Sequence, residues 1–561
     1  MNKWETLEHN GPIFPKEYEY IGFDKNLSPL AEEMLYHYSA KLETEYVHNK
    51  VFNKNFWNAL KPELPKEYQS KTLEDFLPLC KEIFNYIQQK KEERKLKTKE
   101  QRLLEAKEKE RIKEKYGWAI LNGEKQPIAS PVIEGPGIMI CRGAHPQNGC
   151  WKFRVKPEDV NINTTNGVKP PNGHKWKSCE ENKSSMELCS YKMRTSTGMI
   201  LRKRILFSAT SIVKQNADQK KFEKAQKLIS HWEELKSHIE KNISNEDLTI
   251  KQSAMVTWLI MNLGIRVGDE KGEDKADTVG ASSLRFEHLT IKDHILKLSF
   301  GGKDSVHYSN SIELPDYIEK ELSILLNGKK KGEMVFPDVT SREVKHFISH
   351  VIDGISAKVF RTAWGSSLLA YELQNAKIKS TMTTSEKIAI FDNASLEVSK
   401  KLNHQKNVGK NFELKSEEMN IRLQQMKDNY NVIEKTIGKQ IKELKVKIDK
   451  LDEKKYNAND RALLKKNYKD KIKRLQERLN KKKKQITDFK LKKELKEKTK
   501  NISLGTARAA YSDPRIGMSF CKTFDIPLEK VYNKSMQAKF SWALNCKKNY
   551  FLNYKIIERL N

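Results

Sequence analysis

The sequence has little cysteine and no long apolar run. Its seven cysteines are scattered and odd in number, with no Cys-x-x-Cys pair and no histidine at a zinc spacing. A disulfide framework and a structural zinc site are therefore not expected, and a reducing compartment is the default. Residues 1–5 contain no apolar stretch, and no apolar run approaches about 20 residues. We expect an intracellular soluble protein that does not bind a membrane.

The sequence also lacks the common signatures of metal and nucleotide chemistry. We find no metal-ligand cluster, no Walker loop, no Gly-x-Gly-x-x-Gly element and no nucleophile elbow. This absence argues against nucleotide hydrolysis, and we expect neither a metal nor a nucleotide cofactor.

What the sequence has in excess is positive charge. The 561 residues include 105 Lys and Arg against 74 Asp and Glu, a net charge of +31. Such an excess predicts a polyanionic partner, most simply nucleic acid, with an anionic membrane surface as the weaker alternative. Hydrophobic residues make up 37% of the chain, which is enough for folded cores, and the length suggests about three or four structural units.

The first 210 residues divide into three stretches. Residues 1–90 mix aromatics with prolines, which is typical of irregular structure with short helices. Residues 90–115 are charged and poor in apolar side chains, so they predict one solvent-exposed helix. Residues 117–207 alternate turn residues with short apolar runs, which indicates a β-rich module.

Residues 215–410 are predicted to be mainly helical, with one β-hairpin. Four apolar residues fall at helical spacing on one face: Val256, Leu259, Ile260 and Leu263. Apolar and polar residues alternate over 296–300 and again over 306–308, around a turn at Gly301-Gly302. Lys303 then lies at the tip of the hairpin, where it could enter a groove.

Residues 413–500 have a different pattern. Apolar residues recur in steps of three and four over 433–451 and 464–479, with a polar break at 456–460. This pattern predicts a coiled-coil seam between two antiparallel helices. The stretch holds 29 Lys and Arg against 15 Asp and Glu, so its +14 is nearly half of the net charge. Residues 501–561 predict a small compact unit.

Five residues in separate segments could act together: Arg266, Lys303, Arg361, His404 and Tyr511. Taken singly, they are more simply an ion-pair arginine, a solvated lysine, a structural histidine and a tyrosine that packs a turn. Taken together, they supply what phosphoryl transfer to tyrosine requires. Guanidiniums fork onto phosphate oxygens, an imidazole donates a further hydrogen bond, and an ammonium protonates the leaving alkoxide. A phenol can attack and hold the phosphate covalently, and fixed cations replace the metal.

The segments that carry these residues closely resemble the eukaryotic-type type IB DNA topoisomerases. The resemblance covers nearly the whole chain. It includes these segments: 7–12, Gly143-Ala144-His145-Pro146, 171–177, 276–280, 283–285, Asp513-Pro514-Arg515-Ile516 and 539–543.

The resemblance implies a multidomain α+β clamp around double-stranded DNA. Its parts would be a mixed α/β cap lobe over 1–210 and a mainly helical catalytic domain, of the tyrosine recombinase and type IB topoisomerase kind, over 211–412. An antiparallel coiled-coil linker over 413–500 and a small helical C-terminal domain with the nucleophilic tyrosine over 501–561 would follow. A monomer is implied, located in the nucleus, or in a viral replication compartment if the source is a virus.

The resemblance also implies the role of each site residue. Arg266, Lys303, Arg361 and His404 look like the activating residues, and Tyr511 looks like the nucleophile. Three further residues match positions close to DNA in the family, namely Lys358, Arg142 and Asp304. The implied reaction forms a 3′-phosphotyrosine, lets the free 5′-hydroxyl strand swivel to release supercoils of either sign, and then religates without ATP or metal.

Some positions depart from the family pattern. Ala510 stands before the nucleophile where Asn is usual, and Met139 and Cys141 stand where an aromatic and a glycine are common. These positions border the pocket used by camptothecin-type poisons, so we expect weakened sensitivity. The chain also begins almost at the clamp, without the long charged N-terminal extension of the nuclear enzymes, which suggests a virus or a compact-genome eukaryote as source.

Two other interpretations remain. A tyrosine recombinase uses a similar residue set, but Lys358 stands where recombinases usually have His, and the basic hairpin between His404 and Tyr511 is foreign to them. A non-enzymatic, basic coiled-coil DNA-binding protein would explain residues 413–500 but not the five-residue set.

Overall fold

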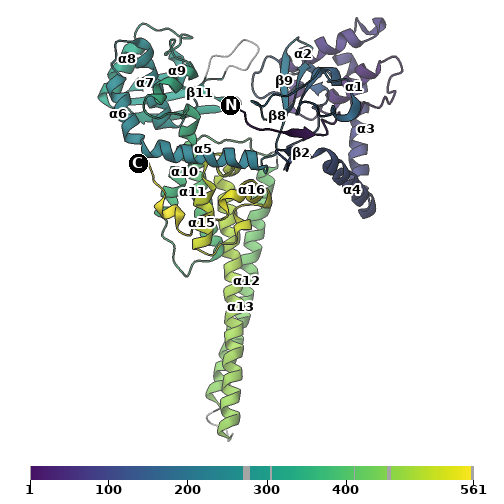
Figure 1. The fold of residues 1–561 in the computed structure, drawn as a ribbon. Helices are drawn as coiled ribbons and strands as arrows, with labels where there is room; N and C mark the ends of the chain where they lie inside the picture. The colour runs from purple at the N-terminus through teal and green to yellow at the C-terminus, as the bar shows by residue number, and fades with distance from the viewer. Residues whose placement is uncertain (1, 269–277, 304–305, 410, 452–456, 558–561) are drawn as a thin grey trace.

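The structure, a computed structural model, describes residues 2–268, 278–303, 306–409, 411–451 and 457–557. Two lobes stand above helix α5 (Ile212–Ser230), and a long helical stalk projects below it (Figure 1). One of these lobes, here called the N-terminal lobe, contains residues 2–207. The other contains α6 to α9 and β10 to β12.

The N-terminal lobe combines four helices with small sheets. The helices are α1 (Pro29–Ser39), α2 (Lys50–Leu60), α3 (Leu77–Leu96) and α4 (Lys99–Tyr116). The strands are β1 (Leu7–His9), β2 (Trp118–Leu121), β3 (Glu124–Pro127), β4 (Gly137–Ile138), β5 (Trp151–Lys152), β6 (Val160–Asn163), β7 (Ser178–Glu180), β8 (Glu187–Arg194) and β9 (Ile200–Leu206). They form sheets ordered β1-β2-β3, β4-β5 and β7-β6-β8-β9. The predicted β-rich module is therefore confirmed.

The charged stretch 90–115 differs from the single helix that we predicted. It is divided between α3 and α4, which are separated at Lys97 and Thr98. Thr98 and Gln101 form a capping box that starts α4, because each side chain satisfies a backbone N–H of the other residue. The exposure of the stretch is as predicted, since none of the residues of α4 is buried.

The second lobe and the region below it surround the largest hydrophobic core. Their elements are α6 (Trp232–Asn242), α7 (Leu248–Leu263), β10 (Leu289–Lys292), β11 (Ile295–Gly301), β12 (His307–Glu313), α8 (Asp316–Leu326), α9 (Ser341–Ser349), α10 (Ala357–Gln374) and α11 (Thr384–Lys401). The predicted hairpin is confirmed, with Phe300 opposite Tyr308 and Gly301 opposite His307. Its two strands extend beyond the predicted residues, and β10 adds a third strand to the sheet.

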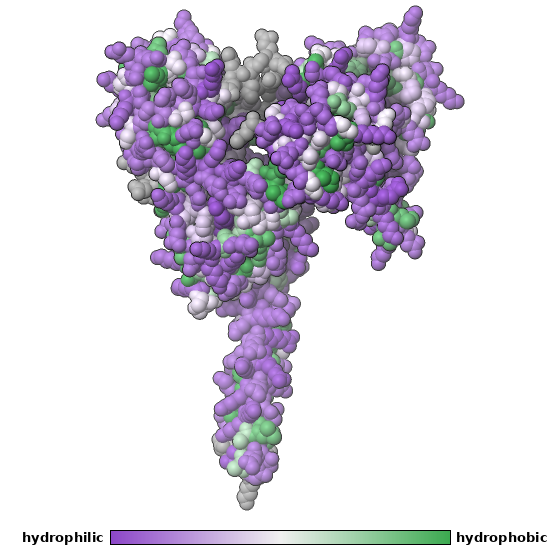
Figure 2. Space-filling model, viewed as in Figure 1, coloured by the Kyte–Doolittle hydropathy of each residue, from purple (hydrophilic) through white to green (hydrophobic). Residues whose placement is uncertain are grey.

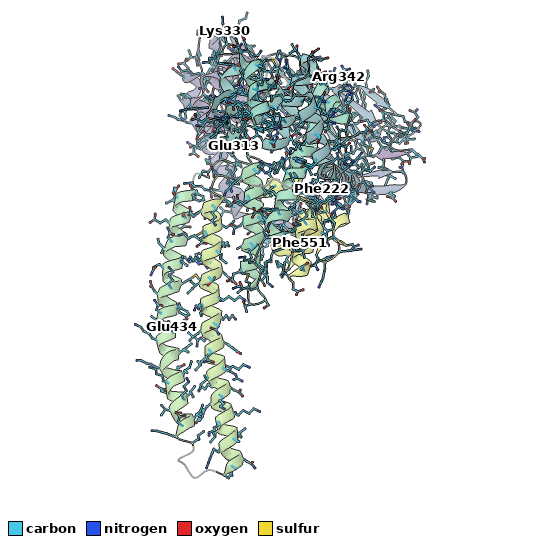
Figure 3. All side chains as sticks on the ribbon, turned by 90° about the vertical axis from the view of Figure 1, so that its left-hand side faces the viewer. Phe222, Glu313, Lys330, Arg342, Glu434 and Phe551 are labelled. Atoms are coloured by element: carbon cyan, nitrogen blue, oxygen red, sulfur yellow. The ribbon has the colours of Figure 1, made fainter. Side chains whose placement is uncertain are left out.

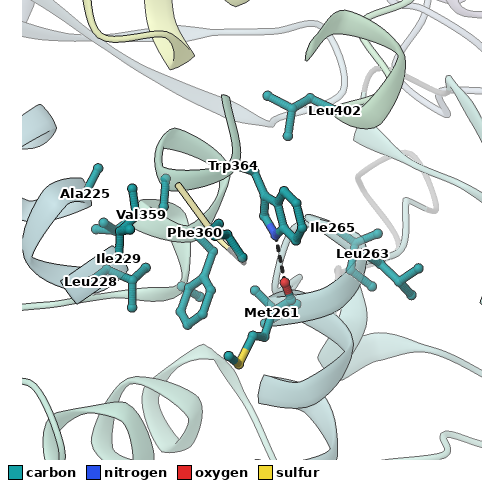
Figure 4. Close-up of a cluster of buried hydrophobic side chains, with 14 of the residues drawn as sticks. Ala225, Leu228, Ile229, Met261, Leu263, Ile265, Val359, Phe360, Trp364 and Leu402 are labelled. Atoms are coloured by element: carbon teal, nitrogen blue, oxygen red, sulfur yellow. Dashed lines mark hydrogen bonds between the residues drawn. The ribbon is translucent and has the colours of Figure 1, made fainter. Parts of the chain in front are cut away.

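Helix α7 is buried on more than the one face that its periodicity predicted. Polar residues such as Gln252, Ser253 and Thr257 are buried along with the apolar ones. Helix α10 packs near it, and the indole N–H of Trp364 donates to the carbonyl of Met261 at 2.7 Å (Figure 4). These two helices form the rigid support on which the site described below is built.

The stalk consists of α12 (Phe412–Asp449) and α13 (Ala458–Lys498), which run side by side (Figures 1 and 3). Leu423, Ile437, Leu444 and Leu451 are buried along the seam. The rest of the stalk surface is mostly hydrophilic, as are the visible faces of the lobes (Figure 2). The predicted break at 456–460 is only partly described: residue 456 falls outside the described ranges, and α13 already begins at Ala458 with Asn457 as its N-cap.

The chain ends in a compact unit packed beneath α5 and α10. Its elements are α14 (Leu504–Thr506), a π-helical turn over Ala507–Tyr511, α15 (Pro514–Thr523) and α16 (Lys534–Lys539). Phe520, Phe540 and Phe551 anchor this unit in the same core as α7 and α10. In the described part of the chain, no helix is both long and apolar enough to cross a membrane.

Candidate active site

Arg361 lies at the centre of the candidate site. It is buried in α10, and its side chain is held by the ends of two other helices. Its Nη1 donates to the carbonyl of Gly264 at 2.6 Å, and its Nη2 donates to that of Leu402 at 2.7 Å. These two residues cap the C-termini of α7 and α11, where unpaired carbonyls carry partial negative charge. The guanidinium is thus fixed by carbonyls, and no carboxylate of the described residues is bonded to it.

The loop that carries Arg266 is shaped by glycines. Gly264 ends α7 in the left-handed conformation with φ of 63°, which glycine adopts without strain. The backbone of Gly268 then touches Gly280 so closely that a Cβ on either would lie within 2.6 Å of the other. The amides of Ala281 and Ser282 bond to the carbonyls of Arg266 and Val267. Arg266 is therefore presented from a fixed backbone while its side chain remains exposed.

His404 follows α11 and is buried next to Arg361. Its backbone N–H bonds to the carbonyl of Ser399 at 2.8 Å, and its Nε2 lies 3.4 Å from Nη2 of Arg361. Because a guanidinium can only donate, this geometry makes Nε2 an acceptor and leaves the proton on Nδ1. Burial, and then the charges of Arg361 and Arg266, lower the pKa of His404 to about 3, so the imidazole is neutral at pH 7.

Tyr511 ends the π-helical turn and is packed against α10. A Cβ at Gly365 would lie 2.7 Å from the carbonyl oxygen of Tyr511, so this approach requires glycine. Ser366 adds a hydrogen bond from its hydroxyl to that carbonyl at 3.3 Å and accepts one from the amide of Asp513 at 3.0 Å. π-Helical turns are rare and occur often at functional sites.

The ring of Tyr511 lies beside both Arg361 and His404, which also contact each other. The guanidinium carbon of Arg361 is 5.0 Å from the ring centroid, and the imidazole of His404 is 4.9 Å from it. Burial raises the pKa of the Tyr511 phenol, but hydrogen bonds and charge from Arg361 and Arg266 outweigh that effect. The net pKa is lowered. The structure therefore brings together four of the five residues singled out in the sequence.

Lys303 lies exposed in the loop at the tip of the β11–β12 hairpin. The tip end of the hairpin strands is tied to the site, because the side chains of Asn403 and Gln405 bond to the carbonyl of His307, in the last strand pair before the loop. The amide of Val279 bonds to the carbonyl of Gly301 on the other strand. The loop that carries Lys303 thus begins at strand ends that are bonded to the neighbours of His404.

The three remaining predicted residues lie farther out or outside the described ranges. Lys358 is exposed on the first turn of α10, one turn before Arg361. Arg142 is exposed in the N-terminal lobe, in the loop between β4 and β5. Asp304 lies outside the described residues.

Two polar atoms of the site are buried without a partner among the described residues. They are Nε of Arg361 and Nδ1 of His404. Buried donors are normally satisfied, so these two N–H groups are suited to bind a group with acceptor oxygens. The described residues contain no group of three His, Cys, Asp or Glu side chains that could hold a metal ion.

Gly365 and Ser366 are site residues that the sequence reasoning missed. A signal was present, since glycine within a helix costs roughly 0.5–1 kcal/mol relative to alanine and is kept where something approaches closely. Which segment approaches Gly365 cannot be read from that signal.

Comparison with known proteins assigns the chain to a family. Its residues 210–437 match the family model of the eukaryotic DNA topoisomerase I catalytic core. Residues 2–200 match the DNA binding fragment of the same enzymes, and residues 483–552 match the C-terminal topoisomerase domain.

Relatives match almost the full length of this chain. It is 32% identical to DNA topoisomerase 1 beta of Arabidopsis thaliana, over 97% of this chain and 59% of the relative. It is 31% identical to DNA topoisomerase 1 of Drosophila melanogaster, covering 54% of that protein. For DNA topoisomerase 1 of Homo sapiens the identity is 30%, covering 71% of that protein.

The matched family models cover the N-terminal lobe, the region that carries Arg266 and Arg361, and the unit that carries Tyr511. The chain belongs to the eukaryotic DNA topoisomerase I family. It spans somewhat more than half of the length of the plant and fly relatives.

Proposed function

We propose that this chain relaxes positively and negatively supercoiled double-stranded DNA by cutting and resealing one strand through Tyr511. The observation that carries the proposal is the position of the Tyr511 ring next to both Arg361 and His404. The net lowering of the pKa of Tyr511 supports it, because a larger phenolate fraction makes a better nucleophile.

In the proposed step, Oη of Tyr511 attacks a backbone phosphorus and displaces the 5′-oxygen of the next nucleotide. The enzyme then holds a 3′-phosphotyrosine, and the phenolic proton leaves to water or to a basic neighbour. The leaving oxygen needs a proton, which Lys303 supplies from the hairpin tip. After strand rotation, the 5′-hydroxyl attacks the phosphotyrosine and restores the original bond.

Arg266, Arg361 and His404 stabilise the charge that develops on the non-bridging oxygens. The orphan Nδ1–H of His404 and Nε–H of Arg361 are donors that a phosphate would satisfy. A neutral imidazole is suited to this task, because it donates a hydrogen bond without repelling the neighbouring guanidiniums. Lys358 and Arg142 act outside this centre as phosphate contacts.

The domain roles follow from the same proposal. Residues 1–210 form the cap of a DNA clamp, residues 211–412 the catalytic domain, residues 413–500 the linker, and residues 501–561 the unit that carries the nucleophile. The +14 charge of the stalk suits it to follow the duplex phosphates downstream of the cut. The chain acts as a monomer in the nucleus or in a viral replication compartment, without ATP.

The test is relaxation of supercoiled plasmid in EDTA without ATP, comparing the wild type with Tyr511→Phe. We expect the wild type to relax DNA of either supercoil sign and the variant to be inactive, since it lacks only the nucleophilic oxygen. Relaxation by Tyr511→Phe at the wild-type rate would refute the proposal. Denaturing the reaction with end-labelled DNA should leave protein on the 3′ end, and exchange of strands between plasmids would instead favour a recombinase.

A further inference from the structure

Helix α5 touches the turn that carries Tyr511 through a chain of polar contacts. Lys539, the last residue of α16, donates from its Nζ to the carbonyl of Ala509 at 2.6 Å. The same Nζ lies 3.3 Å from Oδ2 of Asp218 on α5. Oδ1 of Asp218 is held in turn by Lys221 at 3.0 Å. Ala509 lies two residues before Tyr511, within the π-helical turn.

These contacts are shielded and bridge distant parts of the chain. The side chains of Asp218, Lys221 and Lys539 are 20, 31 and 23% exposed, so their interactions are less screened than those at an open surface. Asp218 and Lys539 are separated by more than 300 residues, and α5 lies directly above α16 (Figure 1).

The turn at 507–511 needs such support because its hydrogen bonding is irregular. A π-helical turn leaves carbonyls without the regular α-helical partner. The ammonium of Lys539 satisfies the carbonyl of Ala509, and Arg508 is anchored separately through Asp392 and Ser395. The turn is therefore fixed from two sides, by α5 through Lys539 and by α11 through Arg508.

Helix α5 is also attached to the N-terminal lobe. The first amide of the helix, at Ile212, donates to Oε1 of the buried Gln126 on β3 at 2.9 Å. Val213 packs against the core of that lobe. One helix thus connects the lobe to the network at Asp218, which lies less than two turns further along.

We propose that Asp218 and Lys539 are positioning residues for Tyr511, and that α5 couples the placement of the nucleophile to the placement of the N-terminal lobe. This inference rests on the proposed function, because it concerns when Tyr511 is aligned for attack. Asp218 orients Lys539, and Lys539 fixes the backbone that carries the phenol. Neither residue needs to touch the scissile phosphate.

The test compares Asp218→Asn, Lys539→Met and Lys539→Arg with Glu223→Gln, a control on the exposed side of α5 that removes one charge without entering the network. Single-turnover formation of the covalent complex is measured on a duplex oligonucleotide whose cleaved end diffuses away. Binding of the same duplex is measured with each substitution placed in a Tyr511→Phe background.

We expect Asp218→Asn and Lys539→Met to slow cleavage at saturating DNA by about tenfold or more, since a misplacement of about 1 Å can cost 100-fold. Asp218→Asn should bind the duplex as the control does, and Lys539→Arg should recover most of the rate because it can still donate to Ala509. Cleavage by Asp218→Asn at the control rate would overturn the inference. A cleavage rate that is reduced at low DNA concentration but equals the control rate at saturating DNA would overturn it as well.

Amide hydrogen exchange of residues 504–513 in the free protein gives a readout that does not need activity. It should be faster in Asp218→Asn and in Lys539→Met than in the control. Unchanged exchange would overturn the inference even if the wild type formed no covalent complex. Absence of covalent complex in the wild type would refute the proposed function instead, so the two failures are distinguishable.

Discussion

The guanidinium of Arg361 lies 5.0 Å from the centre of the Tyr511 ring, and among the described residues it is held there by two carbonyls and by no carboxylate. A carboxylate partner would cancel the charge that lowers the pKa of the phenol. Carbonyl partners orient the guanidinium and leave its full positive charge to act on the tyrosine and on an incoming phosphate.

The pH dependence of cleavage should change when Arg266 is replaced. Arg266 contributes to the lowered pKa of Tyr511, so Arg266→Ala should raise that pKa and reduce the phenolate fraction at neutral pH. The cleavage rate of the variant should therefore continue to rise at pH values where the wild type has levelled off. Single-turnover cleavage measured from pH 6 to 10 tests this prediction, and parallel profiles for the two proteins would contradict it.

The loss of stability of the free protein at low pH should depend on His404. Its folded pKa, about 3, lies below the unfolded value of about 6.5, so the unfolded state binds more protons between these values. Stability is therefore lost as the pH falls through this window, by up to about 1.4 kcal/mol per pH unit. His404→Gln removes this term. Its Tm should fall less than that of the wild type between pH 7 and pH 4.5, and an equal fall would contradict the prediction.

Gly365→Ala should displace the nucleophile. The added Cβ would lie 2.7 Å from the backbone of Tyr511, which must move away. We expect a loss of about 1–3 kcal/mol of stability from this overpacking and a larger loss of cleavage rate. Gly438→Ala is the matched control, because its Cβ would meet no atom within 4 Å and it also lies within a helix. A Gly365→Ala variant that cleaves like the control would argue against the observed packing.

The stalk charges should act through phosphates without sequence preference. Replacing the four lysines at 481–484 by glutamine should make DNA binding weaker and less dependent on salt, with a slope of log K against log salt reduced by roughly 0.9 per lost contact. Cleavage of saturating oligonucleotide should not change. Equilibrium binding over a range of salt concentrations tests this prediction, and an unchanged slope would show that these lysines do not contact DNA.

Position 510 should govern sensitivity to camptothecin-type poisons. Ala510 lacks the amide that the family usually has before the nucleophile, so the wild type should be weakly trapped by the drug. Ala510→Asn should restore trapping, measured as drug-dependent covalent complex on plasmid DNA. Strong trapping of the wild type at ordinary doses would contradict this expectation.

Local patterns predicted the local elements well. The alternation at 296–308 predicted the hairpin, and the spacing over 413–500 predicted two long helices, because period and turn residues act within a few neighbours. The break at Thr98 could have been read from Thr98-x-x-Gln101, but it was hidden in a uniformly charged stretch. The burial of α7 on several sides was not predictable from its own residues, since it depends on what packs around it.

The assembly of the site was accessible only through resemblance. No spacing rule indicates that Arg361 and Tyr511, which are 150 residues apart, should meet. Asp218 and Lys221 look like an ordinary helical ion pair at i and i+3, and Lys539 looks like one of many surface lysines. Their connection depends on the docking of the C-terminal unit against α5, which is a tertiary event.

The described residues form three separate hydrophobic cores, and this separation bears on how the proposed clamp could open around circular DNA. Two of the cores belong to the N-terminal lobe, and the third begins on α5 and includes the C-terminal unit. A rotation of the lobe about the start of α5 would therefore leave the buried side chains within each of the three cores packed together. A circular plasmid offers no end to thread, so the proposed clamp would have to admit it sideways. With separate cores, that opening would be a hinge motion instead of partial unfolding.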